Sequence, residues 1–331
     1  MRPRRLVCAA TAGAVVLGLG VLPACTPDPV DVDTAAAGGG VAAGERFDFS
    51  PEQAGRVRSE PDPQAAALVP ESVAEDGKLT VAANPGAVPL AFAATDQQTV
   101  VGSEVDIAQL MADKLALELE VEATSWENWP LRLETGQIET VMINVGLTEP
   151  RLELYDFATY RTAYMGFEAV RGSDLRVEGP EDIAGLKVSV SPGTNQDRIL
   201  LEWNRELEEQ GREPAELSYY LNDADSVLAL VSGRIDLYLG PYPSGTFREA
   251  SGSDTQIVGR ISAGWPNSTL VAAPTDKGSG LAPALEAALD SAMRDGTYDE
   301  ALQRWGLQDE ELQDSRTVTD AEQMEQALAE S

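Results

Sequence analysis

From residue 78 onwards, short apolar runs alternate with stretches in which apolar residues recur every three or four positions. The runs predict buried strands, and the periodic stretches predict amphipathic helices. In the first half of the chain we expect strands at residues 79–83, 119–121, 138–145 and 165–170, with helices at 103–115 and 126–134. This alternation favours a mainly parallel sheet flanked by helices, and therefore the α/β class.

The same pattern begins again near residue 187. Strands are expected at 187–191, 217–221 and 235–239, with helices at 199–207 and 224–231 between them. Residues 133–139 (LETGQIE) and 231–236 (VSGRID) both carry a helix end, a glycine, a polar residue, an isoleucine and an acid before a buried strand. We therefore expect two lobes of similar topology. A strand at 269–273 and helices at 281–293 and 298–305 follow the second lobe and are expected to return to the first.

Residues 133–160 (LETGQIETVMINVGLTEPRLELYDFATY) are the stretch on which the rest of the chain is organised. The strand expected at 138–145 runs into a polar turn with Asn144, Gly146 and Thr148, and Arg151 then opens a short helix. A strand end that brings small groups, backbone N–H groups and one arginine to a helix start suits an anion such as a carboxylate. We expect the chain before this stretch to position the site and the chain after it to build a second lobe that closes over it.

Composition narrows the class of protein. A net charge of −31 over 331 residues argues against a nucleic-acid partner, because phosphates would be repelled over most of the surface. The chain has no histidine, which excludes an imidazole base and a histidine-ligated metal. Both cysteines, Cys8 and Cys25, precede the folded body, so the body has no disulfide and no thiol nucleophile. We expect no metal and no cofactor.

The amino terminus has the three parts of an export signal. Basic residues at positions 2, 4 and 5 precede an apolar stretch at 6–22 that is short and glycine-rich for a membrane span. Leu22-Pro23-Ala24-Cys25 then resembles a bacterial lipobox, which implies a signal peptide at 1–24 and a lipid on Cys25. The alternative is an ordinary secretory signal with an incidental cysteine. Residues 25–76 are expected to be the anchor cysteine and a flexible linker, and the alternative for residues 45–76 is docking onto the body.

Seven segments support a resemblance to a known family. In chain order they are LTVAANPGAVPLAF, GSEVDIAQLMADKL, SWENWPLRLETGQIETVMINVGLTEPR, YDFATY, DIAGLKVSVSPGTNQ, SGRIDLYLGP and DGTYDEALQRWGL. Together they resemble the family 3 extracellular solute-binding proteins of ABC importers, the polar amino-acid group. The resemblance implies a two-lobed, periplasmic-binding-protein-like (type II) fold with two hinge strands. Residues 77–170 and 269–307 would form lobe 1, residues 171–268 lobe 2, and residues 308–331 an acidic tail.

The resemblance also implies a ligand site. Arg151 falls where the family arginine clamps the ligand carboxylate in two parallel hydrogen bonds. Asn144 and Gly146 fall where small residues or backbone groups hold the ligand, and Thr194 and Asn195 fall where backbone N–H groups at a helix start meet the same carboxylate.

The amine side of the implied site departs from the family pattern. Gly240 and Pro241 stand where relatives commonly present an aspartate to the ligand ammonium. Either another acid receives the ammonium, or the ligand is not a standard α-amino acid. An aromatic wall suited to a cation or a ring is a further expectation; its candidates are Phe92, Trp126, Tyr238, Tyr242 and Trp265.

The leading functional hypothesis is a lipid-anchored, extracytoplasmic receptor on the outer face of the cell membrane. It would capture an amino acid or a related carboxylate as a monomer and deliver it to an ABC permease. Closure on the ligand would be the mechanism. A ligand sensor without transport is the second hypothesis. A dehydratase or lyase on the same fold is the third; no residue in the expected site stands out as a general acid or base, so we expect no enzyme activity.

Overall fold

The computed structural model describes residues 47–330. The predicted signal peptide, the lipidation of Cys25 and the linker up to residue 46 lie outside the described residues. Among residues 47–330, no helix has the length and apolar character needed to cross a membrane.

A parallel sheet of three strands organises the first lobe, with β1 between β5 and β6. These strands are β1 (Lys78–Ala83), β5 (Glu118–Ala123) and β6 (Thr140–Met142). The strand expected at 138–145 is shorter in the structure, because the backbone of Asn144 turns into the left-handed region at φ 59°. A small antiparallel sheet follows β1 and is made of β2 (Gly86–Ala87), β3 (Ala91–Ala93) and β4 (Val100–Val101).

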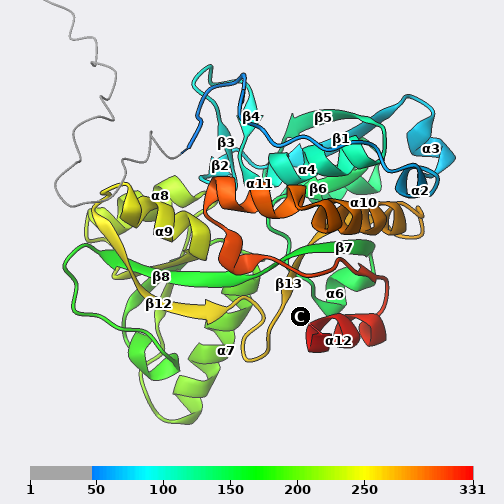
Figure 1. Ribbon diagram of the computed structural model, residues 1–331. Coiled ribbons are helices and arrows are strands. Elements are labelled where there is room, and N and C mark those ends of the chain that lie inside the picture. The colour runs from blue at the N-terminus through cyan, green and yellow to red at the C-terminus, as the bar shows by residue number, and fades with distance from the viewer. Residues whose placement is uncertain (1–46, 331) are drawn as a thin grey trace, which may run out of the picture. The chain divides into compact units, whose positions relative to one another are not determined.

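Helices from distant parts of the chain cover this lobe. The helices α10 and α11 pack against α4 and run beside it in Figure 1. The helices of the lobe are α4 (Ser103–Lys114), α5 (Trp129–Glu134), α6 (Glu149–Leu152), α10 (Ala282–Asp295) and α11 (Thr297–Trp305). The last two confirm that the chain returns to the first lobe after the second.

A third sheet carries the chain out of the first lobe and back. The strand β7 (Tyr155–Thr162) pairs antiparallel with β13 (Leu270–Asp276) and with β14 (Thr317–Val318). The outgoing chain passes through Ala163, and the N–H of Ala263 on the returning chain donates a hydrogen bond to the Ala163 carbonyl at 3.0 Å. The two crossings therefore lie side by side, as expected for a two-lobed fold with two hinge strands.

The second lobe contains a five-stranded mixed sheet of order β10-β9-β11-β8-β12. Only β9, β10 and β11 are parallel, so the expectation of a mainly parallel sheet holds for three of its five strands. The strands are β8 (Tyr164–Val170), β9 (Lys187–Val190), β10 (Glu216–Tyr219), β11 (Leu237–Pro241) and β12 (Thr255–Ser262). Because β8 belongs to this sheet, we propose that the lobe boundary lies at Ala163 and not at residue 170.

Three helices of the second lobe each follow a strand of its sheet: β9, β10 and β11. They are α7 (Asn195–Glu209), α8 (Asp223–Val231) and α9 (Tyr242–Ala250), and a short 3₁₀ turn, η2 (Pro180–Ile183), precedes β9. Thr194 caps α7 and Asn222 caps α8, each by accepting a hydrogen bond from a backbone N–H three residues later. Both caps fix the direction in which the helix starts point.

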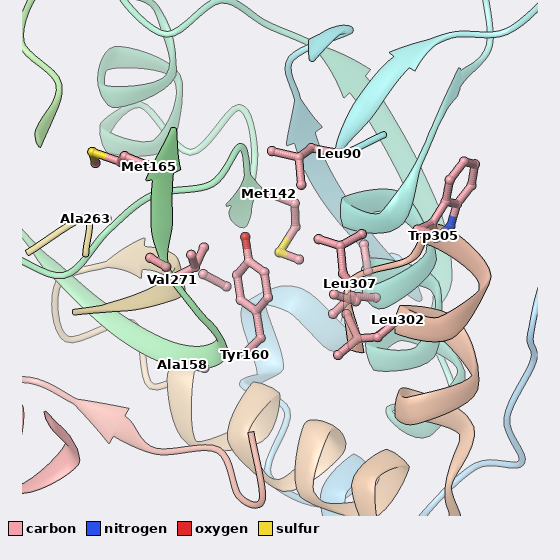
Figure 2. Packing of buried hydrophobic residues seen from close by; sticks show 14 of the residues in the cluster. Leu90, Met142, Ala158, Tyr160, Met165, Ala263, Val271, Leu302, Trp305 and Leu307 are labelled. Carbon is pink, nitrogen blue, oxygen red and sulfur yellow. The ribbon is translucent and has the colours of Figure 1, made fainter. Parts of the chain in front are cut away.

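The main hydrophobic core contains residues of both lobes. Tyr160 lies among the labelled residues, with Met142, Leu90, Leu302, Leu307 and Trp305 on one side of it and Val271, Met165 and Ala263 on the other (Figure 2). All of these residues are buried. The core therefore joins β6 and β7, which lead into the site, to the last helix of the lobe.

The segments before and after the two lobes pack on the first lobe. Phe47 stacks on Trp305 with ring centroids 5.6 Å apart, and Arg58 makes a two-point ion pair with Asp113 at 2.7 and 2.6 Å. Two short helices, α2 (Pro63–Ala66) and α3 (Glu71–Ala74), follow, and the tail adds η3 (Gln308–Glu310), β14 and α12 (Ala321–Glu330). Residues 47–76 are thus folded against the body and are not a free linker, because aromatic and charged side chains dock there.

Candidate functional site

A cavity of about 450 Å³ lies between the two lobes. The first lobe contributes the loop from Asn84 to Ala91 together with Trp126 and Asn144, and the second lobe contributes residues from the starts of α7 and α8 and from β11. A smaller cavity of about 20 Å³ adjoins it, since Trp126, Asn144 and Gln196 line both. This placement makes the cavity the candidate site for a small ligand.

Arg151 lines the smaller cavity. Its Nη1 donates to the carbonyl of Gly146 at 2.7 Å and to Oδ1 of Asn195 at 3.3 Å, and its guanidinium lies 5.2 Å from the Trp126 ring centroid. Among residues 47–330, no carboxylate forms an ion pair with it. Burial lowers the pKa of Arg151 to about 10, so the cation is poorly solvated and favours an anion beside it.

The start of α7 faces Arg151 from the other lobe. Asn195, the first residue of α7, accepts a hydrogen bond from Arg151 and donates from Nδ2 to the carbonyl of Ala263 at 3.1 Å. Thr194 caps the helix and lines the larger cavity. Free N–H groups and the positive end of the helix dipole are therefore presented next to a guanidinium, which is an arrangement that binds a carboxylate.

Gly146 lies where the two lobes approach each other closely. Its neighbour Leu147 donates a backbone hydrogen bond to Leu270, so this segment is fixed against β13. A Cβ atom at position 146 would lie 2.6 Å from Nδ2 of Asn195. Glycine at this position lets the Arg151 loop approach the start of α7.

Asn144 lines both cavities, but its side-chain oxygen is already engaged. Oδ1 accepts a hydrogen bond from Nη2 of Arg161 at 2.6 Å, and the Asn144 N–H donates to Oε2 of Glu104 at 3.3 Å. The Glu104 carboxylate also accepts hydrogen bonds from Nη2 of Arg161 at 2.8 Å and from the hydroxyl of Tyr160. These contacts fix the turn before Arg151, and they leave the amide NH₂ of Asn144 for a ligand.

The second lobe places an acid at the cavity that the sequence interpretation did not identify. Asp223, the first residue of α8, lines the cavity beside Tyr238 of β11. The Tyr238 hydroxyl donates to Oδ1 of Asp223 at 2.7 Å, whereas the buried Oδ2 accepts no hydrogen bond. Burial raises the pKa of Asp223 from its usual range, since the charged form loses water that one hydrogen bond replaces only in part.

The predicted site residues divide between the cavities and the core. Six of them line one cavity or both: Trp126, Asn144, Gly146, Arg151, Thr194 and Asn195. Tyr238 also lines the larger cavity. Phe92 does not line these cavities, because it packs against Phe49 and Trp305 at centroid distances of 5.2 and 5.7 Å. Tyr242 and Trp265 also lie outside the larger cavity, so Trp126 and Tyr238 are the aromatic walls there.

Glu104 and Asp223 carried little signal in the sequence. Both lie in the first turn of a helix, where an acid is common because it complements the helix dipole. The only indication for Asp223 was its position directly after the helix cap Asn222, at a strand–helix junction of the second lobe.

Comparisons with known proteins agree with this geometry. The family model of bacterial extracellular solute-binding proteins, family 3, matches residues 79–308. The arginine-binding protein ArgT of Corynebacterium glutamicum is 28% identical over 259 residues, which cover 77% of this chain and 82% of the relative. The L-cystine-binding protein TcyJ of Escherichia coli strain K12 is 30% identical over 169 residues, covering 50% of this chain and 60% of the relative.

Solved structures share the fold. An ancestral arginine-binding protein bound to arginine aligns with a TM-score of 0.60 and 24% identity, covering 69% of this chain and 98% of that one. The ancestral amino acid-binding protein AncCDT-1, a precursor of cyclohexadienyl dehydratase, aligns with a TM-score of 0.61 and 22% identity, covering 72% and 99%. At these identities the likeness establishes the two-lobed α/β fold.

Proposed function

Because the chain belongs to the bacterial extracellular solute-binding proteins, family 3, we propose that it captures an amino acid or a related carboxylate between its lobes and delivers it to a membrane permease of an ABC importer. The observation that carries the proposal is Arg151, a half-buried cation that faces the start of α7 across the lobe interface and forms no ion pair with a carboxylate of residues 47–330. A carboxylate in the small cavity would join Arg151 of one lobe to α7 of the other. Binding would thereby stabilise the closed arrangement.

The relatives support this class of ligand. The two curated relatives bear the names of an arginine-binding and an L-cystine-binding protein, and both of those amino acids carry an α-carboxylate. We propose a binding role without catalysis. The alternative is an enzyme on the same fold, because one structural neighbour is described as a precursor of a dehydratase. We expect the protein to leave its ligand chemically unchanged, which mass spectrometry of the solute before and after incubation checks.

Titration calorimetry of the purified protein against the common amino acids and simple dicarboxylates tests the proposal. The variant Arg151→Met should weaken binding of the best ligand by roughly 100-fold or more, because two hydrogen bonds to a charged group at about 1.5–3 kcal/mol each are lost. Arg176→Met is the matched control, since Arg176 is exposed and its side chain, within residues 47–330, bonds only to the neighbouring carbonyl of Leu175. Unchanged affinity in Arg151→Met would refute the carboxylate clamp.

Anchoring through Cys25 is a separate part of the proposal and rests on the lipobox-like Leu22-Pro23-Ala24-Cys25. Two or more acyl chains hold a protein on a membrane, at about 0.8 kcal/mol per buried CH₂ group. We expect the wild-type protein in the membrane fraction and Cys25→Ser in the soluble fraction. Intact-mass analysis that finds Cys25 unmodified in the membrane-derived protein would exclude the lipid anchor.

A further inference from the structure

The larger cavity presents negative charge and no positive charge. Of the charged residues described at 47–330, its lining includes Glu104, Glu127 and Asp223 and contains no lysine or arginine. Arg151 opens onto the smaller cavity instead. The two cavities together thus have one cationic end and one acidic region, joined through Trp126 and Asn144.

Of the three acids, Asp223 alone has a buried oxygen free of hydrogen bonds. Glu104 is fully buried, and its two oxygens accept from Arg161, Tyr160 and the backbone of Asn144. Glu127 is exposed, so solvent satisfies it. Oδ2 of Asp223 is shielded from water and unpartnered by any hydrogen bond, which is costly unless a donor arrives.

The nearest cation to Asp223 is committed to another acid. Arg248 of α9 makes a two-point pair with Glu168 of β8 at 3.0 and 2.5 Å, while its distance to Oδ2 of Asp223 is 3.8 Å. The three groups together carry one net negative charge. Since Arg248 balances Glu168, the surplus charge resides on Asp223 at the cavity wall.

Glycine at position 240 makes room for this arrangement. The family resemblance leads one to expect an acid near the end of β11, where Gly240 and Pro241 stand. A Cβ atom on Gly240 would lie 2.6 Å from the hydroxyl oxygen of Tyr238, so the phenol ring occupies space that a side chain at 240 would need. That ring reaches Asp223, which positions the carboxylate at the start of α8.

We propose that Asp223 receives the positively charged group, an ammonium or a guanidinium, of the solute whose carboxylate Arg151 clamps. This rests on the proposed function and specifies its ligand as a molecule that carries both charges. The cation pairs with the Asp223 carboxylate at the cavity wall, where Tyr238 supplies the one hydrogen bond that the carboxylate accepts within residues 47–330. The acid that is absent from the end of β11 is thereby replaced by one from a different element.

The test is calorimetric binding of L-arginine, L-glutamine and Nα-acetyl-L-arginine to the wild type, Asp223→Asn and Asp225→Asn. Asn at 223 keeps the shape and the acceptor for Tyr238, so folding is retained, and the unfolding temperature checks this. Asp225 is the matched control: it lies on the same helix, carries the same charge, is exposed and is outside the cavity lining. We expect Asp223→Asn to lose about tenfold or more in affinity for L-arginine and Asp225→Asn to stay within about twofold.

The other two probes identify the cation. A loss for L-glutamine assigns the α-ammonium to Asp223, because that ligand has a neutral side chain. A loss for Nα-acetyl-L-arginine assigns the guanidinium, because the α-nitrogen of that ligand is uncharged. A wild type that binds these amino acids and an Asp223→Asn variant of equal affinity for all of them would overturn this inference and leave the proposed function standing. A wild type that binds neither amino acids nor simple dicarboxylates would overturn both.

Discussion

Replacing Arg161 with methionine should destabilise the first lobe strongly. Arg161 forms buried ion pairs with Glu104 and Glu310 and donates to Asn144 at 2.6 Å. The side chains are 1% exposed for Arg161, 0% for Glu104 and 4% for Glu310, so the variant leaves two carboxylates buried without a cation. Removing one partner of such a group costs about 3–5 kcal/mol.

The corresponding fall in unfolding temperature is on the order of 10 °C for a body of this size. Thermal and urea unfolding followed by circular dichroism measure it. Arg132→Met is the control, because Arg132 pairs with Glu122 at side-chain exposures of 20% and 38%, where ion pairs contribute about 1 kcal/mol or less.

The destabilisation should also depend on pH. Burial raises the pKa of Glu310, and loss of the Arg161 charge raises it further. A folded-state pKa above the unfolded value means that the folded protein takes up the proton first as the pH falls, so acidification favours the folded form. The penalty of Arg161→Met should therefore shrink between pH 7 and about pH 5. A penalty below about 1 kcal/mol, or one that grows on acidification, would refute Glu104, Arg161 and Glu310 as a buried charge network.

Two further predictions concern the site. Gly146→Ala places a Cβ 2.6 Å from the Asn195 amide, so ligand affinity should fall about tenfold with little change in unfolding temperature. Gly55→Ala is the control and should bind the ligand normally, because no atom lies within 4 Å of its added Cβ. Equal affinity of the two variants would exclude the close approach at Gly146. Burial raises the pKa of Asp223, so this carboxylate gains a proton as the pH is lowered from 7 to 5. The affinity for L-arginine should therefore fall over this range, and the pH dependence should vanish in Asp223→Asn. The other charged or titratable groups against Asp223 are unchanged in that variant: Tyr238, Arg248 and Glu168. A pH profile that is the same in both proteins would contradict the role of Asp223.

Local sequence signals predicted most elements of the fold. Alternation of apolar runs and amphipathic stretches identified β1, β5, β9 and β11 with the helices between them, and the apolar run after Gly136 led to Arg151. These signals are enough to locate strands and helices because the spacing of apolar residues and a glycine at a helix end each depend on only a few neighbouring residues.

What the sequence did not reveal depends on contacts between distant segments. No strand was assigned to 155–162, although all but its last residue are buried, because its polar residues Asp156, Thr159 and Arg161 interrupt the apolar pattern. Their burial depends on partners such as Glu310, 149 residues away. In the same way, Phe92 lies in the core and outside the two cavities because Trp305, more than 200 residues later, packs on it.

A ligand that lacks the carboxylate, combined with the Arg151→Met variant, tests whether Arg151 binds the ligand carboxylate. Agmatine is arginine without its carboxylate, so calorimetric titration of both ligands into the wild type and Arg151→Met isolates the proposed contact. We expect the wild type to prefer arginine by roughly 100-fold and Arg151→Met to bind arginine and agmatine with nearly equal affinity. An Arg151→Met protein that still prefers arginine by the wild-type ratio would contradict the claim that Arg151 binds the carboxylate.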